Sequence, residues 1–331
     1  MAMNGKVIRS LLRDYMKRNT NRRPSALISM DTPQLDHIPA DGAVVSWFGH
    51  SAFFLQLGGQ KLLIDPMLGK APSPLPIFGS SRYSGKPPIE VSQLPQIDAV
   101  LISHDHYDHL DAGTIKGLKN KVKRFFVPIG VAARLVKWGI SPDHIQELNW
   151  WEETTYEGLK LACTPARHFS GRGLFDRDST LWCSWVIEGG DTKVFYSGDS
   201  GYDDHFREIG ERYGPFDLTL MECGQYDERW SAIHMMPEET VQAHIDVNGR
   251  ILIPVHWGAF TLALHTWTDP IDRAIRAAAG REVLVATPRI GQLMNINGTE
   301  YPSEAWWRAS VDERLRGHTS NSMNPRRYNR E

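Results

Sequence analysis

The chain has 331 residues, of which 41% are hydrophobic and 23% are charged, a composition that suits a packed soluble domain and excludes disordered and collagen-like classes. Lys and Arg total 37 against 39 for Asp and Glu, so the formal net charge is −2 and the chain lacks the excess positive charge typical of proteins that bind a nucleic-acid backbone. No apolar run approaches the roughly 20 residues that a membrane-spanning helix needs.

The three cysteines, Cys163, Cys183 and Cys223, lie far apart in the sequence. They cannot all pair, which excludes a disulfide scaffold and favours a reducing compartment. The N-terminus shows no continuous apolar segment ending in a small-residue cleavage site, so no secretory signal is expected. We therefore expect a cytoplasmic protein.

Residues 1–23 predict a basic amphipathic helix. Seven basic side chains alternate with apolar residues at helical spacing, which are Val7, Ile8, Leu11, Leu12, Tyr15 and Met16. The helix either packs its apolar stripe on its own domain or lies on a membrane surface that carries anionic lipid. The second interpretation makes 1–23 a candidate for peripheral membrane contact. We assign residues 1–40 to this helix and a linker.

Short apolar runs broken by glycine follow, and they predict a meander of strands over Ala43–Phe48, Ala52–Leu57 and Lys61–Ile64. Residues 66–90 contain six prolines and predict a long loop. Loops of that length inside a compact domain are usually functional. Ile97–Ser103 then predicts a buried strand.

Helices and strands alternate in the rest of the chain. We predict helices at Ala112–Lys119, 130–138, 203–213, 237–247 and 270–279, and strands at Arg124–Val127, 159–163, 181–187, 193–197, Asp217–Met221, Arg250–Val255 and 282–286. This order favours a layered α/β sandwich with helices outside two sheets. We assign residues 41–300 to one catalytic domain and 301–331 to a partly disordered C-terminal segment, because residues 315–331 are polar and rich in Arg and Asn.

The strongest chemical signal follows the strand Ile97–Ser103, where the chain reads HDHYDH. Residues two apart in extended chain point to one side, so His104 and His106 can reach one cation. Asp108 and His109 follow on the turn and can reach a second cation. A buried core histidine would explain one of these residues but not four, so the motif predicts a metal site.

Three polar residues farther along also end apolar strands: His168, Asp199 and His256. In an α/β fold, residues that are distant in sequence form one site when they lie at the ends of neighbouring strands. Zinc is bound by imidazole and carboxylate ligands, and a catalytic zinc keeps a position open. A purely structural metal module would fill that position, which disfavours a non-enzymatic interpretation.

The HxHxDH motif, followed by His, Asp and His at separations of 59, 31 and 57 residues, resembles the metallo-β-lactamase superfamily. Over roughly residues 44–275 the chain is similar to its N-acylphosphatidylethanolamine-hydrolysing phospholipase D branch. The blocks that carry this closer resemblance are LNWWEE, RYGPFDL and HWGAF. The resemblance implies a four-layer αββα sandwich.

It also implies two zinc ions per chain. His104, His106 and His168 would hold one, Asp108, His109 and His256 the other, and Asp199 would bridge both. A metal-bound hydroxide would then attack phosphorus and convert N-acylphosphatidylethanolamine to N-acylethanolamine and phosphatidate. The alternative is a lactonase, ester hydrolase or β-lactam hydrolase of the same fold.

Three further residues are candidates with two open interpretations each. His234 matches a position that the family places beside the phosphate, or it is a surface histidine where a helix begins. The mammalian enzyme has Gln before this His, whereas this chain has Ile233. Asp65 either orients a ligating histidine or forms a turn before Pro66. His50 either contacts a metal-ligating residue or the substrate, or has a structural role.

Overall fold

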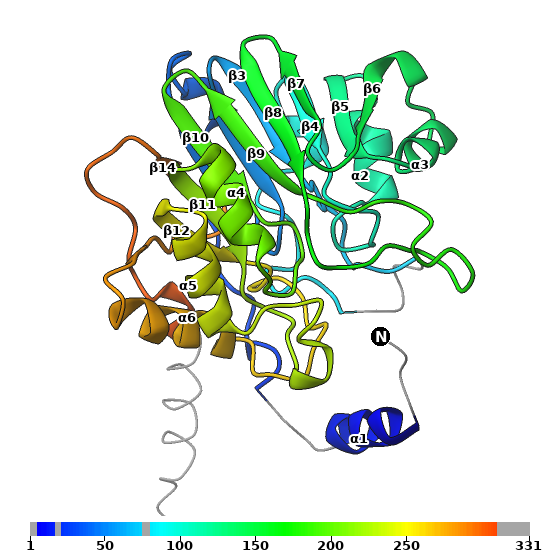
Figure 1. Ribbon diagram of the computed structural model, residues 1–331, viewed down its shortest axis with the longest axis vertical. Coiled ribbons are helices and arrows are strands. Elements are labelled where there is room, and N and C mark those ends of the chain that lie inside the picture. Colours follow the sequence, from blue (N-terminus) through cyan, green and yellow to red (C-terminus); the bar gives the residue numbers. More distant parts are fainter. Residues whose placement is uncertain (1–4, 17–20, 75–79, 310–331) are drawn as a thin grey trace, which may run out of the picture.

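The computed structural model describes residues 5–16, 21–74 and 80–309. Two mixed seven-stranded sheets form its centre, and helices lie outside both (Figure 1). The first sheet has the order β14 (Leu293–Asn295), β1 (Val44–Trp47), β2 (Phe53–Leu57), β3 (Gln60–Ile64), β4 (Ile97–Leu101), β5 (Val122–Pro128) and β6 (Ile145–Leu148). The second has the order β13 (Leu284–Val285), β12 (Gly249–Val255), β11 (Phe216–Glu222), β10 (Thr192–Tyr196), β9 (Ser184–Gly189), β8 (Leu159–Thr164) and β7 (Glu153–Tyr156).

Each sheet combines an antiparallel meander with parallel strands. Strands β1 to β3 pair antiparallel and β3 to β6 pair parallel, while β7 to β10 pair antiparallel and β10 to β13 pair parallel. The helices are α1 (Gly5–Met16), α2 (Ala112–Leu118), α3 (Ala132–Lys137), α4 (His205–Tyr213), α5 (Pro237–Asp246) and α6 (Asp269–Ala279). Short 3-10 turns are η1 (Leu35–His37), η2 (Val91–Gln93), η3 (Pro142–His144) and η4 (Glu228–Trp230).

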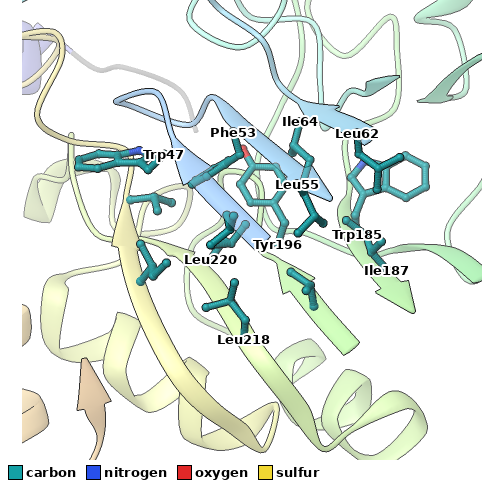
Figure 2. Close-up of a cluster of buried hydrophobic side chains, with 14 of the residues drawn as sticks. Trp47, Phe53, Leu55, Leu62, Ile64, Trp185, Ile187, Tyr196, Leu218 and Leu220 are labelled. Atoms are coloured by element: carbon teal, nitrogen blue, oxygen red, sulfur yellow. The ribbon is translucent and has the colours of Figure 1, made fainter. Parts of the chain in front are cut away.

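The alternation of side chains along each strand produces separate apolar layers. In β2, Phe53 and Leu55 enter the core between the sheets, whereas Phe54 faces the outer core under α2 and α3. Figure 2 shows the inter-sheet core, where side chains of the first sheet meet Trp185, Tyr196 and other side chains of the second. A third core lies between the second sheet and helices α4 and α5. The expected four-layer αββα sandwich is therefore confirmed.

Three strands that the sequence did not predict lie at sheet edges: β6, β7 and β14. They are short, and β7 is half exposed along its length. Apolar and polar residues alternate little in such strands, so they are recognised as strands only by their hydrogen bonds to a neighbouring strand. Strand β14 lies beyond the last predicted strand, 282–286, and pairs antiparallel with β1.

The apolar core also receives side chains from outside residues 41–300. Ile28 and Trp307 are buried in the core between the sheets. The Trp307 ring lies edge-on to Trp257, with ring centroids 5.6 Å apart. Residues up to 309 therefore pack on the body of the protein, while the disorder predicted for 315–331 falls outside the described residues.

Helix α1 covers the middle of the predicted 1–23 helix. Residues 21–23 are not helical, so the helix is shorter than the sequence pattern suggested. Within the described ranges, none of the helices combines the length and apolar character that crossing a bilayer requires.

Candidate metal centre

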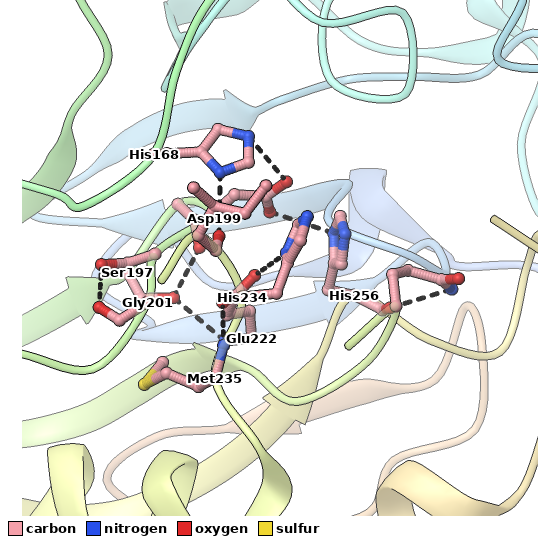
Figure 3. Close-up of polar contacts among 12 residues, drawn as sticks. His168, Ser197, Asp199, Gly201, Glu222, His234, Met235 and His256 are labelled. Atoms are coloured by element: carbon pink, nitrogen blue, oxygen red, sulfur yellow. Dashed lines mark hydrogen bonds and ion pairs between the residues drawn. The ribbon is translucent and has the colours of Figure 1, made fainter. Parts of the chain in front are cut away.

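The structure brings all seven predicted ligands together at one edge of the two sheets. The HDHYDH segment follows β4, His168 follows β8, Asp199 follows β10 and His256 follows β12. In Figure 3, His168, Asp199, His234 and His256 point toward one another from these separate segments. Two sheets therefore supply one cluster, as the positions at strand ends predicted.

The first group consists of three histidines whose ring nitrogens face each other. Nδ1 of His106 lies 3.0 Å from Nε2 of His104 and 3.2 Å from Nε2 of His168. Three nitrogens this close cannot all be satisfied by hydrogen bonds among themselves, since each pair shares at most one proton. They form a set of converging donor atoms suited to a cation.

The second group contains Asp108, His109 and His256, and the structure adds His50 to it. One ligand atom from each of the four lies within 4.8 Å of all the others. Oδ2 of Asp108 is 3.6 Å from Nε2 of His109 and 4.0 Å from Nε2 of His256. This donor set of imidazole and carboxylate also suits zinc.

Asp199 lies between the two groups. Its Oδ2 is 3.2 Å from Nε2 of His109 and 3.7 Å from Nε2 of both His104 and His168. Its Oδ1 is 3.1 Å from Nδ1 of His256. One carboxylate thus faces ligand nitrogens of both groups, which is the position that a bridging ligand requires.

Unsatisfied polar atoms in this cluster support the fit to a metal. Oδ1 of Asp199 and Nε2 of His109 are buried and have no hydrogen bond of acceptable geometry with any described residue. Buried polar groups normally have a partner because burying them alone is costly. A metal ion held by these atoms would supply that partner.

The protonation equilibria of the cluster also favour a cation. Burial lowers the pKa of His104 and His168 well below the ordinary value and that of His106 to about 4, so these imidazoles are neutral, as metal ligands must be. Burial raises the pKa of Asp199 to about 7, against the effect of nearby His109. A buried carboxylate of this kind is stabilised by positive charge beside it.

A layer of hydrogen bonds fixes the orientation of the predicted ligands. Nδ1–H of His109 donates to Oδ2 of Asp65 over 2.7 Å, and both side chains are fully buried. Asp65 also accepts hydrogen bonds from the backbone N–H of Ser103 and the hydroxyl of Tyr196. With Nδ1 engaged in this way, Nε2 of His109 faces the cluster.

Two other histidines of the predicted ligand set are oriented by groups that the sequence did not reveal. Nδ1–H of His168 donates to the backbone carbonyl oxygen of Ile233 over 2.9 Å. The hydroxyl of Ser103 donates to Asp65, so its oxygen can accept Nδ1–H of His104 at 2.9 Å. A backbone carbonyl carries no sequence signal, which is why the first of these partners was missed.

His50 contacts a predicted ligand directly. Its Nε2 lies 2.8 Å from Oδ2 of Asp108, and its ring lies 4.1 Å from that of His256. Burial raises the pKa of Asp108, but its electrostatic interaction with His109 and the hydrogen bond from His50 outweigh burial and hold the pKa well below its ordinary value. His50 therefore favours the ionised form of Asp108.

His234 faces the cluster and is held by a carboxylate that the sequence analysis missed. Its Nδ1–H donates to Oε2 of Glu222 over 2.9 Å, and Oε1 of Glu222 accepts the backbone N–H of Met235 over 2.9 Å. Glu222 is fully buried at the end of β11. Its place at a strand end, which Asp199 and His256 share, is the signal that could have identified it.

A pocket of about 480 Å³ opens above the cluster. Its floor contains predicted ligands and His234. Its walls are mostly apolar and consist of Leu11, Phe169, Trp230, Ile233, Leu262, Ala263 and Leu264. Two arginines, Arg177 and Arg229, also line it. The predicted loop at 66–90 contributes no described residue to this lining. Sequence motifs alone do not reveal these walls, because the wall residues come from four separate stretches of the chain.

Comparison with known proteins agrees with this arrangement. Residues 60–257 match the model of the β-lactamase superfamily domain. An uncharacterized protein of Mycobacterium tuberculosis is 42% identical over 305 residues, covering 91% of this chain and 81% of the relative. The N-acyl-phosphatidylethanolamine-hydrolyzing phospholipase D 1 of Caenorhabditis elegans is 34% identical over 260 residues, covering 74% and 72%.

Among solved structures, the fold is similar to that of Igni18, a metallo hydrolase from the archaeon Ignicoccus hospitalis. The TM-score is 0.57 at 21% identity, with 76% of this chain and 97% of the other covered. From the matched domain, the curated relatives and the four-layer fold, the chain belongs to the metallo-β-lactamase superfamily, in the branch that includes the N-acylphosphatidylethanolamine-hydrolysing phospholipases D.

Proposed function

We propose that the chain is a dinuclear zinc phosphodiesterase of the phospholipase D type. Its substrate would be N-acylphosphatidylethanolamine, and its products N-acylethanolamine and phosphatidate. The observation that carries the proposal is the position of the metal centre at the floor of a pocket with apolar walls and two arginines. A polar reaction centre beneath apolar walls suits a phosphodiester that carries acyl chains.

Each zinc would have a defined set of ligands. His104, His106 and His168 would hold one ion, Asp108, His109 and His256 the other, and Asp199 both. When bound, paired divalent metals neutralise phosphoryl charge and acidify a water molecule. The relative from Caenorhabditis elegans, whose name states this lipid activity, supports the assignment.

The polypeptide itself would position the phosphodiester. Glu222 engages Nδ1 of His234, which leaves Nε2 to donate to a phosphoryl oxygen or to the departing alkoxide. Arg177 lies on the pocket lining and would attract the anionic diester, whereas Arg229 is already paired with Asp227 and Asp14. The guanidinium of Arg177 lies 4.2 Å from the ring centroid of Phe169, which fixes its place beside the apolar wall.

The test is hydrolysis of N-acylphosphatidylethanolamine in mixed micelles by the purified protein, with metal content measured on the same sample. We expect about two zinc ions per chain and activity that a chelator abolishes and added zinc restores. No turnover by protein that carries two zinc ions would contradict the lipid assignment. A parallel panel of a lactone, a carboxylic ester and a β-lactam tests the alternative hydrolases, and faster turnover of one of these would replace the phosphodiesterase proposal.

The Asp199→Asn variant tests the bridging role. It should lower activity by at least about a hundredfold and reduce the zinc content. A neutral amide is a poor metal ligand and no longer supplies the negative charge that balances the buried cations. Asp204→Asn is the matched control, since Asp204 is highly exposed and its side chain lies at the start of α4. If Asp199→Asn keeps two zinc ions and full activity, Asp199 does not bridge.

A further inference from the structure

Two adjacent apolar side chains project almost completely into solvent from the loop between β8 and β9. Leu174 is 91% exposed and Phe175 is 99% exposed, the highest values among the large hydrophobic side chains of the described residues. Single exposed apolar residues are common on protein surfaces, but a neighbouring Leu and Phe at full exposure form a feature that calls for a partner.

The loop holds these side chains outward on a well-bonded base. Oδ1 of Asp176 accepts the backbone N–H groups of Arg172 and Gly173 at 3.1 and 2.6 Å, and its Oδ2 pairs with Arg134 at 2.7 Å. The backbone N–H of Gly171 donates to the buried Asp105 over 2.8 Å. The tip is thus preorganised in its exposed position.

The base of this loop belongs to the pocket of the metal centre. Phe169 and Arg177, which flank the tip in sequence, both line the pocket. Figure 1 shows the loop between β8 and β9 extending from the body of the protein on the side where α1 lies. Whatever the tip binds is therefore held beside the pocket entrance.

Helix α1 meets the same pocket from another segment. Leu11 lines the pocket, and Arg229 ties the helix to the pocket wall through the Ser10 hydroxyl at 3.0 Å and the Asp14 carboxylate at 3.1 Å. The far end of the helix exposes Tyr15 and Met16 at 73% and 76%.

The charge of this helix is positive. Arg9 and Arg13 are exposed on it, and its sequence contains three basic residues against one acidic residue. Apolar side chains beside exposed arginines are typical of segments that lie at a membrane surface with anionic lipids.

We propose that Leu174 and Phe175 insert into the interfacial layer of a phospholipid bilayer, while the basic surface of α1 contacts anionic headgroups, so that the pocket opens onto the membrane. The proposal rests on the proposed lipid substrate and adds how that substrate reaches the site. A bilayer fits better than a protein partner because two side chains are far too small an area for a protein interface, which buries about 800 Å² on each side.

The experiment measures binding of the zinc-loaded protein to vesicles of phosphatidylcholine with and without phosphatidylglycerol. The test variant is Leu174→Ser/Phe175→Ser. The control is Val136→Ser/Leu284→Ser, which removes two half-exposed apolar side chains on α3 and β13 that do not line the pocket. We expect the test variant to bind vesicles at least about tenfold more weakly, since it loses two buried apolar groups, and the control to bind like the unchanged protein.

Activity toward two substrates separates this inference from the proposed function. The test variant should lose activity toward N-acylphosphatidylethanolamine in vesicles and retain, within about twofold, hydrolysis of soluble bis(p-nitrophenyl) phosphate. Absence of diester hydrolysis by the unchanged protein would contradict the proposed function, while vesicle binding would still decide the insertion. Normal vesicle binding by the test variant would overturn the proposed insertion. If the same two substitutions convert a dimer to a monomer and leave vesicle binding unchanged, the tip is a protein interface instead.

A second measurement covers the case in which the double variant folds poorly. Phe175→Cys can be labelled selectively with an environment-sensitive fluorophore, because Cys163, Cys183 and Cys223 are buried. We expect the emission to shift to the blue when anionic vesicles are added. Emission that stays unchanged while the protein is bound to vesicles would exclude insertion of this tip. Arg9→Glu/Arg13→Glu should weaken the preference for phosphatidylglycerol and leave the shift on saturating vesicles in place.

Discussion

Two buried carboxylates, Asp65 and Glu222, determine how histidines at the centre face the pocket. Asp65 engages Nδ1 of His109, and Glu222 engages Nδ1 of His234. An imidazole has two nitrogens, and a fixed acceptor on one side leaves the other directed away from it. These carboxylates therefore set the direction of the two rings without contacting substrate.

The Glu222→Gln variant tests this role at His234. Glu222 accepts hydrogen bonds from both His234 and the backbone N–H of Met235, whereas Gln has a single oxygen and must turn its NH₂ group toward one of these donors. We expect kcat to fall by about 10- to 100-fold, with a smaller change in KM, because the ring loses its fixed orientation. Steady-state kinetics with bis(p-nitrophenyl) phosphate measure both constants.

Glu208→Gln serves as the control for this substitution, since Glu208 lies on α4, is half exposed and pairs only with Arg212 among the ionic partners described for it. An exposed pair of this kind contributes little to stability. Unchanged kcat in Glu222→Gln with an intact fold would show that His234 needs no positioning by Glu222.

At the scale of elements, the ends of the strands position the polar residues of the candidate metal centre. Strands β10, β11 and β12 run parallel, so Asp199, Glu222 and His256 leave the sheet at one edge. In the first sheet, β3 and β4 are parallel as well, which brings Asp65 beside the HDHYDH segment. Parallel pairing thus converts residues that are distant in sequence into neighbours.

Helix α5 contains a buried histidine that makes the fold sensitive to acid. Nδ1 of His244 lies 2.7 Å from the Thr219 hydroxyl on β11, and burial lowers the pKa of His244 from 6.5 to about 4. Between these pH values the unfolded chain binds a proton that the folded protein excludes. The stabilising contribution is therefore complete above pH 6.5 and is lost as the pH falls through 4, by up to about 3 kcal/mol.

The measurement is the free energy of unfolding in urea at several pH values between 7 and 4, for the unchanged protein and His244→Gln. The variant should be less stable at pH 7, since the amide fills the site less well, and should lose less stability on acidification. His144→Gln, which changes an exposed histidine, should follow the unchanged protein. Parallel pH profiles for all three proteins would contradict a role for His244.

At the scale of the whole molecule, the metal centre links the two sheets. The first sheet leads into His104, His106, Asp108 and His109, whereas the second supplies His168, Asp199 and His256. A ligand that binds only the folded state stabilises it in proportion to the logarithm of its concentration. Ions held by both sheets would therefore stabilise the packing between them.

Removal of metal should consequently lower the unfolding temperature. A zinc concentration 1,000-fold above Kd corresponds to about 4 kcal/mol for one site, and treatment with EDTA removes this contribution. Thermal unfolding followed by circular dichroism, with and without EDTA, gives the difference, and added zinc should restore it. Asp199→Asn should show a smaller shift, and an unfolding temperature of the unchanged protein that is insensitive to EDTA would contradict metal linkage of the sheets.

Most helices and strands could be predicted from the amino-acid sequence, because apolar periodicity is a local property of the chain. The sequence placed β2, β3, β4, β10 and β12 within a few residues of their bounds. The sequence also indicated the polar residues that end these strands, since an apolar run such as IPV is followed directly by a polar residue, His256. Edge strands β6 and β7 were missed because pairing with a neighbour, rather than their own pattern, defines them.

The contacts between residues far apart in the sequence became visible in the folded structure. It showed that Glu222 faces His234, that the carbonyl of Ile233 orients His168, and that Leu11 of α1 and Phe169 line the same pocket. None of these contacts follows from spacing, because the separation in space is set by how the two sheets and their loops pack. Local pattern fixes where a side chain leaves its strand, and the packing of the layers fixes what it then meets.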